Sequence, residues 1–324
     1  MKSLFYKLGR LVYRQFGWSA QQRVSRQYNG VIKDAVSSNA MIYDIIKKGN
    51  PAMISRLGTV ETAVLFNYLE IKESTSFSRV KKLHAVFKGS ANEWDSDVKK
   101  SIKDNAGFFP VNEEMLDRFT VFFLEQIKKI DAIAIWGFVV GETWLVHRLC
   151  QAAFKYDPKG LEPYYFSDPW SRALAGKTVL VIHPFIHSIR KQYKCREKLF
   201  DNPLILPDFN LVTIAAVQSI AGNSTEFKNW FEALDYMQRE IDNVNFDVAI
   251  IGAGSYGLPL AAYIKEKGKI AIHIGGATQI LFGIKGKRWD DHPVISKFYN
   301  EHWVRPELSE TVLNAEMVEG GCYW

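Results

Sequence analysis

The chain has 324 residues, a mass of 37.1 kDa and 47% hydrophobic residues, which is enough for a large buried core. Its net charge of +6 favours phosphate-bearing ligands or an anionic surface but is too diffuse to indicate a nucleic-acid partner, and no nucleic-acid-binding motif is present. Three isolated cysteines exclude a disulfide framework and a zinc cluster, and the uncharged runs are too short to cross a bilayer. A cytoplasmic protein is therefore expected.

Residues 1–27 carry apolar side chains at helical spacing, with Lys7, Arg10 and Arg14 on another face. This pattern predicts a basic amphipathic helix, which either lies on the inner face of an anionic membrane or packs on its own domain or a partner subunit. Residues 28–324 are expected to form a single α/β domain.

Short apolar strands alternate with amphipathic helices along this domain. Strands are predicted at 52–55, 132–136, 178–182, 211–215, 247–251 and 270–274, and helices at 28–48, from 59, at 116–129, 143–154, 189–199, 225–243 and 258–267. Strands separated by helices require right-handed crossovers, so we expect a mainly parallel, Rossmann-like sheet flanked by helices. Ligands bind such sheets at the carboxyl ends of the strands.

A glycine-rich turn follows the strand at 247–251. Gly252, Gly254 and Gly257 match G-x-G-x-x-G, and Ser255 and Tyr256 lie between them. Glycines at this position let backbone N–H groups approach a phosphate, which the helix N-terminus also attracts. A dinucleotide site needs an acidic residue about 20 positions later, and none occurs between Lys267 and Asp290. Phosphate binding is favoured over hydride transfer; the alternative is that the glycines only permit close helix–strand packing.

A second strand-to-helix junction contains Arg56, Gly58, Thr59 and Glu61. Arginine can hold a phosphate by two hydrogen bonds, and the first turn of a helix suits a phosphate or a carboxylate. The junction is therefore predicted to bind a sugar nucleotide; alternatively, Arg56 and Glu61 pair structurally and Glu61 caps the helix.

The two junctions together resemble the GT-D type of bacterial glycosyltransferase, which carries an R-x-G-D-G-E-like corner near the N-terminus. Arg56, Gly58 and Glu61 match that corner, and residues 260–263 and 273–276 resemble a later LA-Y-like helix and an xIGH-like strand. The resemblance covers both ends of the fold and, more weakly, most of residues 52–284. It implies a GT-D-like fold, a nucleotide-diphosphate sugar donor and a glycan or lipid-linked acceptor.

The chain departs from this family at Thr59, where the family has an aspartate implicated in holding a divalent ion. Because Mg²⁺ and Mn²⁺ require several oxygen ligands, no tightly bound metal is expected, and at most a weakly held ion would arrive with the substrate. Thr59 alternatively marks a site that has lost transfer activity.

The candidate catalytic residues are Glu61 and His183, either of which could act as the base for an acceptor hydroxyl. The candidate sugar-nucleotide-binding residues lie at predicted strand ends and are Arg56, Gly58, Thr59, Gly252, Gly254, Ser255, Tyr256, His273, Gly275, Gly276 and Gln279. The sequence thus predicts a glycosyltransferase-like enzyme of bacterial surface-glycan synthesis. The alternatives are an NAD(P)- or flavin-dependent oxidoreductase and a catalytically degenerate sugar-nucleotide-binding protein.

Overall fold

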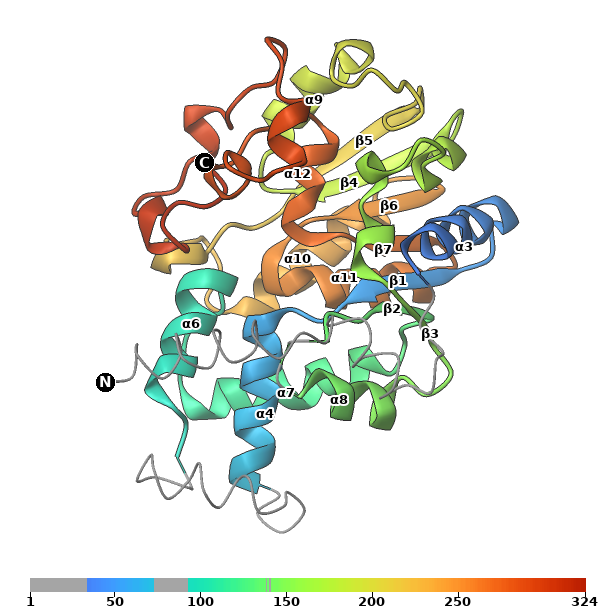
Figure 1. Ribbon diagram of the computed structural model, residues 1–324. Helices are drawn as coiled ribbons and strands as arrows, with labels where there is room; N and C mark the ends of the chain where they lie inside the picture. The colour runs from blue at the N-terminus through green and yellow to red at the C-terminus, as the bar shows by residue number, and fades with distance from the viewer. Residues whose placement is uncertain (1–33, 73–92, 138, 140) are drawn as a thin grey trace, which may run out of the picture.

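The computed structural model describes residues 34–72, 93–137, 139 and 141–324. Within these residues, seven parallel strands form one sheet in the order β3-β2-β1-β7-β6-β4-β5 (Figure 1). The predicted helix at 1–27 lies outside the described residues. The expectation of an α/β fold with a parallel sheet is confirmed.

The strands are β1 (Ala52–Arg56), β2 (Ala132–Ala134), β3 (Phe154–Tyr156), β4 (Thr178–His183), β5 (Asn210–Ala215), β6 (Val248–Ile251) and β7 (Ile270–His273). The described α-helices are α3 (Ala35–Lys48), α4 (Thr59–Lys72), α6 (Ser96–Ala106), α7 (Glu113–Ile127), α8 (Glu142–Leu149), α9 (Ile186–Tyr193), α10 (Trp230–Asp242), α11 (Gly257–Glu266) and α12 (Thr278–Leu281). None of these helices is both long and apolar enough to cross a membrane.

Local sequence signals account for several of the element ends. The Asn229 side chain caps α10 by accepting from the N–H groups of Phe231 and Glu232. Gly49 takes a left-handed conformation directly after α3. All four residues of β6 are buried, as a strand covered on both faces requires.

One predicted helix is too long. Residues 143–154 were expected to be helical, but α8 ends at Leu149 and Phe154 begins the edge strand β3. This strand has only three residues and pairs on one side with β2, so it is too short for an alternating pattern to reveal it.

Two hydrophobic layers cover the sheet on opposite faces. One layer contains the buried side of α11, such as Leu258 and Ile264, and the other contains the buried side of α9, such as Ile189. These helices leave from β6 and β4, which are neighbours in the sheet. Because the connections that follow β4 and β6 run to opposite faces, the carboxyl ends of these two strands mark a topological switch point, which is where parallel sheets bind ligands.

Candidate functional site

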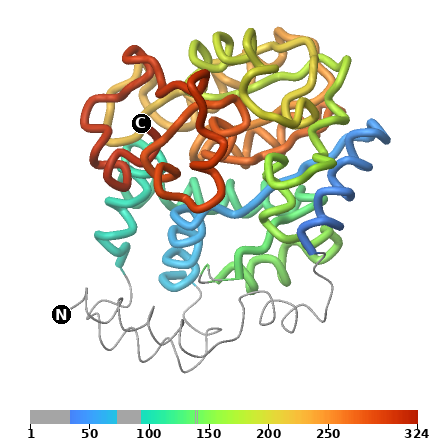
Figure 2. The backbone as a smooth tube through the Cα atoms, turned by 45° about the horizontal axis from the view of Figure 1, so that its top comes forward, coloured from blue at the N-terminus to red at the C-terminus, as the bar shows by residue number. Residues whose placement is uncertain are grey.

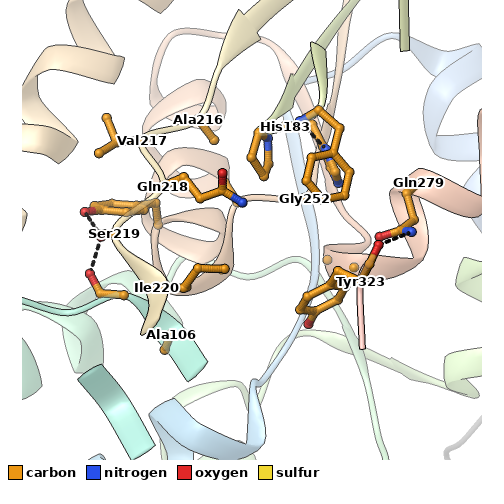
Figure 3. A pocket seen from close by; sticks show the side chains of 18 of the residues that line it. Ala106, His183, Ala216, Val217, Gln218, Ser219, Ile220, Gly252, Gln279 and Tyr323 are labelled. Atoms are coloured by element: carbon orange, nitrogen blue, oxygen red, sulfur yellow. Dashed lines mark hydrogen bonds between the residues drawn. The ribbon is translucent and has the colours of Figure 1, made fainter. Parts of the chain in front are cut away.

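A cavity of about 100 Å³ lies at this switch point and opens to solvent (Figure 3). It is formed by the segments that follow β4, β5, β6 and β7, by the end of α6 and by the last residues of the chain. Its lining residues are Arg56, Asn105, Ala106, Gly107, His183, Pro184, Phe185, Ala216, Val217, Gln218, Ser219, Ile220, Gly252, Ala253, Gly254, Tyr256, His273, Gly275, Gly276, Gln279 and Tyr323.

Arg56 links the end of β1 to the segment that follows β7. It is the last residue of β1, and its Nε donates to the carbonyl oxygen of Ile274 just beyond β7 at 3.1 Å. Its guanidinium lies 5.4 Å from the centre of the Trp136 ring and so close to Gly275 that a Cβ there would overlap it. In the described part of the chain no carboxylate lies within ion-pair distance of Arg56. The buried carboxyls of Glu61 and Glu162 interact with Arg56 electrostatically but form no ion pair with it. The cavity therefore contains a half-buried cation that can bind an anion.

The three motif glycines have different structural roles. A Cβ at Gly252 would lie 2.7 Å from atoms of His183, Gly275 and Thr278, and a Cβ at Gly257 would overlap the His273 ring. Glycine at these two positions therefore permits close packing between the helix and the strands, as the alternative interpretation of the motif predicts. Gly254 differs, because its φ of +52° is left-handed and a Cβ there would meet only Ala106 O at 3.5 Å.

The turn after β6 also offers backbone donors. The N–H of Gly252 bonds to Ile182 O within the sheet, whereas those of Ala253 and Gly254 have no acceptor among the described residues. Both residues line the cavity. Successive unpaired N–H groups in such a turn form a site that suits an anion.

The two histidines of the cavity are buried and neutral. Burial lowers the pKa of His183 to about 3, and burial together with the nearby Arg56 lowers that of His273 to about 3. His273 Nδ1 lies 3.0 Å from Ser55 Oγ, while its other nitrogen faces Gly257. His273 is therefore packed between β1 and α11, and its side chain ties the sheet to the helix.

Four of the predicted site residues do not line the cavity: Gly58, Thr59, Glu61 and Ser255. Thr59 is exposed at the start of α4, and the Glu61 carboxylate folds back over Gly58. Burial raises the pKa of Glu61, and Arg56 opposes part of that shift. Ser255 Oγ donates to Ala106 O at 2.7 Å and accepts from Trp230 Nε1, so it is engaged within the core.

Tyr256 and Gln279 line the cavity, but their side chains are engaged in contacts within the protein. The Tyr256 ring stacks on Trp230 at 5.0 Å, and its hydroxyl lies 3.3 Å from Ser219 Oγ, so the ring is not available to stack on a ligand. The Gln279 Nε2 donates to three carbonyl oxygens, those of Ile284, Lys285 and Tyr323. Its Oε1 is buried and has no partner among the described residues.

The described residues do not form a metal site of the family type. No three His, Cys, Asp or Glu side chains come together in the described ranges. The Glu61 carboxylate faces Gly58, and Asp290 forms a salt bridge with Arg305 at 2.8 Å.

The sequence interpretation missed several lining residues, among them Gln218, Ser219 and Tyr323. Gln218 follows the predicted strand at 211–215, so the rule that ligands bind at strand ends would have identified it. Tyr323 carries no such signal. It reaches the cavity because the C-terminal segment folds back beside α6, as Figure 2 shows in red and teal.

Comparison with protein-family models, curated proteins and solved structures finds no match for this chain.

Proposed function

We propose that this chain is a glycosyltransferase-like enzyme that binds a nucleotide-diphosphate sugar with its diphosphate in the cavity beside β4, β6 and β7. The observation that carries the proposal is Arg56, a cavity-lining guanidinium that forms no ion pair with a carboxylate among the described residues. The unpaired N–H groups of Ala253 and Gly254 support it. Together they suit a diphosphate better than a neutral ligand.

The chemistry that these groups supply is stabilisation of the leaving group. In sugar transfer, the bond between the anomeric carbon and a diphosphate oxygen breaks, and the diphosphate leaves with the electron pair. Arg56 and the two backbone donors stabilise the negative charge that develops on it. The acceptor oxygen forms the new bond to the anomeric carbon, and its proton passes to an oxygen of the departing diphosphate. The acceptor class, a glycan or a lipid-linked glycan of a bacterial surface, rests on the GT-D resemblance.

Two other functions each rest on one feature. The G-x-G-x-x-G motif favours a nicotinamide or flavin enzyme, although His273, Ile274 and Gly275 occupy the end of β7 where an acidic residue would bind the ribose. Thr59 favours a sugar-nucleotide-binding protein without transfer activity.

Calorimetric titration with uridine and guanosine diphosphates, their sugars and NADH separates these functions. We expect a diphosphate or its sugar to bind, and Arg56→Ala to weaken binding about 10- to 100-fold because a charge-assisted hydrogen-bond donor is lost. Arg239→Ala, at an exposed position on α10, is the matched control and should bind as the wild type does. Binding of NADH alone would favour the oxidoreductase, and binding of none of these ligands by the folded protein would overturn the proposal.

The test for transfer activity is release of free sugar from a bound donor. If the wild type releases none and Thr59→Asp gains Mn²⁺-dependent release, the natural site is degenerate. Turnover by the wild type supports the enzyme.

A further inference from the structure

The proton on His183 is located by its hydrogen bond. His183 is the last residue of β4, and its Nδ1 accepts from the backbone N–H of Phe185 at 3.0 Å. A ring nitrogen that accepts a hydrogen bond carries no proton, so in the neutral imidazole the proton lies on Nε2. The structure therefore makes Nε2–H a donor.

The surroundings fix the ring in this orientation. His183 is 3% exposed, and Gly252 lies so close to its Cδ2 that no side chain fits between them. The Phe185 ring meets the imidazole edge-on, with centroids 4.9 Å apart. In the described part of the chain, Nε2 has no acceptor, and His183 lines the cavity. A rigid, unpaired N–H donor is thus available to a ligand.

Gln218 provides a second neutral donor. It follows β5, and its Nε2 is buried without a partner among the described residues. In Figure 3 its amide extends into the cavity beneath the His183 ring, on the side away from Tyr323 and Gln279. Its neighbour Ser219 cannot take this role, because the Ser219 hydroxyl donates to Gly107 O at 2.5 Å.

We propose that His183 Nε2–H and the Gln218 amide N–H are a pair of neutral donors for a phosphate oxygen of the ligand, with Arg56 supplying the positive charge. This inference deepens the proposed function and rests on it for the identity of the ligand. It makes His183 a binding residue that holds its proton, in place of the general base expected from the sequence. An oxyanion has only acceptors, so a cavity lined by these three donors matches its hydrogen-bonding needs.

The tautomer can be measured without any ligand. With ¹⁵N-labelled histidine, long-range ¹H–¹⁵N correlation spectra of the full chain should show His183 protonated at Nε2 and unchanged between pH 5.5 and 8. The other titratable groups lining the cavity are Arg56, His273, Tyr256 and Tyr323, and they add no negative charge in that range. A proton on Nδ1, or a ring that titrates in this range, would overturn the inference.

The second test measures the affinity for inorganic pyrophosphate at pH 7.5 in two variants. They separate the two roles of His183, which are to accept a hydrogen bond at Nδ1 and to donate one at Nε2. The Asn side chain of His183→Asn can accept from the Phe185 N–H but has no donor at the Nε2 position, so affinity should fall about 10- to 100-fold. The amide of His183→Gln restores a donor near Nε2, and affinity should largely return. His187→Gln, at an exposed position four residues later, is the control and should have no effect.

Gln218→Glu tests the partner donor. A carboxylate in place of the amide repels the oxyanion, so it should weaken pyrophosphate binding at least as much as His183→Asn does. If pyrophosphate binding depends on these residues but no nucleotide sugar binds, the donor pair stands and the proposed function fails. If nucleotide sugars bind equally to the wild type and to His183→Asn, the donor pair is refuted and the proposed function stands. Absence of pyrophosphate binding by the folded wild type would also refute the donor pair.

Discussion

At the scale of single residues, Arg56 connects parts of the chain that are more than 200 positions apart. Its Nε donates to Ile274 O, and Ser55 beside it contacts His273. Both links follow from the pairing of β1 with β7, which brings the two strand ends to one edge of the sheet. The proposed anion site therefore depends on a tertiary contact between an early arginine and the late glycines that follow β7.

Gly254 gives a prediction about backbone conformation. Because its φ is +52° and a Cβ there has room, we expect Gly254→Val to be destabilising by about 1–2 kcal/mol or more through left-handed strain. Gly254→Asn should cost clearly less, since asparagine tolerates this conformation. Urea unfolding of both variants measures the difference. Equal losses would show that crowding, and not φ, sets the requirement for glycine.

At the scale of elements, the C-terminal segment at residues 319–324 contributes Tyr323 to the lining of the cavity. The Gln279 amide on α12 holds it by donating to Tyr323 O at 3.1 Å, and the Tyr323 ring lies against Gly276. The backbone of Trp324 accepts from the N–H of Lys287 at 3.1 Å. These contacts place an aromatic side chain where no strand end would provide one.

Gln279→Met should release this segment. The substitution keeps the side-chain volume but removes the donor to three carbonyl oxygens, so we expect a loss of about 1–3 kcal/mol and faster amide hydrogen exchange in residues 319–324. Mass spectrometry of peptides after deuterium exchange measures the change in exchange rate. Gln151→Met, at an exposed position, should leave exchange unchanged. Unaltered hydrogen exchange in Gln279→Met would show that the Gln279 amide does not hold residues 319–324 in place.

The loop after β2 is held by a buried carboxylate. Glu142, at the start of α8, accepts from the N–H groups of Trp136 at 3.0 Å and Gly137 at 2.8 Å. Burial raises its pKa to about 7, although these two hydrogen bonds oppose the shift. Trp136 in turn lies against Arg56, so the carboxylate supports the cavity indirectly.

Because the pKa of Glu142 is higher in the folded state than in the unfolded state, the folded protein binds more protons between pH 4.5 and 7. The contribution of Glu142 to stability is therefore greatest below pH 4.5 and falls by about 3 kcal/mol as the pH rises to 7. Urea unfolding at pH 5 and pH 7.5 should show a smaller pH dependence for Glu142→Gln than for the wild type. Glu114→Gln, on the surface of α7, should retain the wild-type dependence. If the stability of Glu142→Gln depended on pH as strongly as that of the wild type, Glu142 would not be the source of the pH dependence.

At the scale of the whole molecule, the strand order creates the site. The chain places β4 beside β6 and sends their helices to opposite faces, so the cavity opens between the two strands. Its lining comes from seven separate parts of the chain, from Arg56 near the start to Tyr323 near the end. A ligand bound there contacts segments that only the folded state brings together.

Ligand binding should therefore stabilise the whole described fold. At a concentration of 100 times Kd, a nucleoside diphosphate is expected to add about 2.7 kcal/mol and to raise Tm by about 5 °C in a single transition. Arg56→Ala, with its 10- to 100-fold lower expected affinity, should show about half of this shift or less at the same concentration. A melting curve that splits into two transitions, with only one moved by ligand, would show that the sheet does not unfold as one unit.

The sequence by itself determined the alternation of strands and helices, because buried parallel strands read as short apolar runs and helices as periodic ones. It also located the glycine turn and Arg56 at strand ends. It did not reveal β3, which is too short to show a pattern, or the side chains of Ser255 and Tyr256 turning into the core.

Only the tertiary structure decided which of these strand ends meet. Strand order depends on how crossovers pack, and it brings His183 against Gly252 and Arg56 against Gly275 while leaving Thr59 and Glu61 outside the cavity. It also decided the proton position on His183, since that depends on the Phe185 N–H that its backbone turn supplies. Local sequence specifies backbone conformation over a few residues, whereas the chemistry of a site depends on contacts between distant ones.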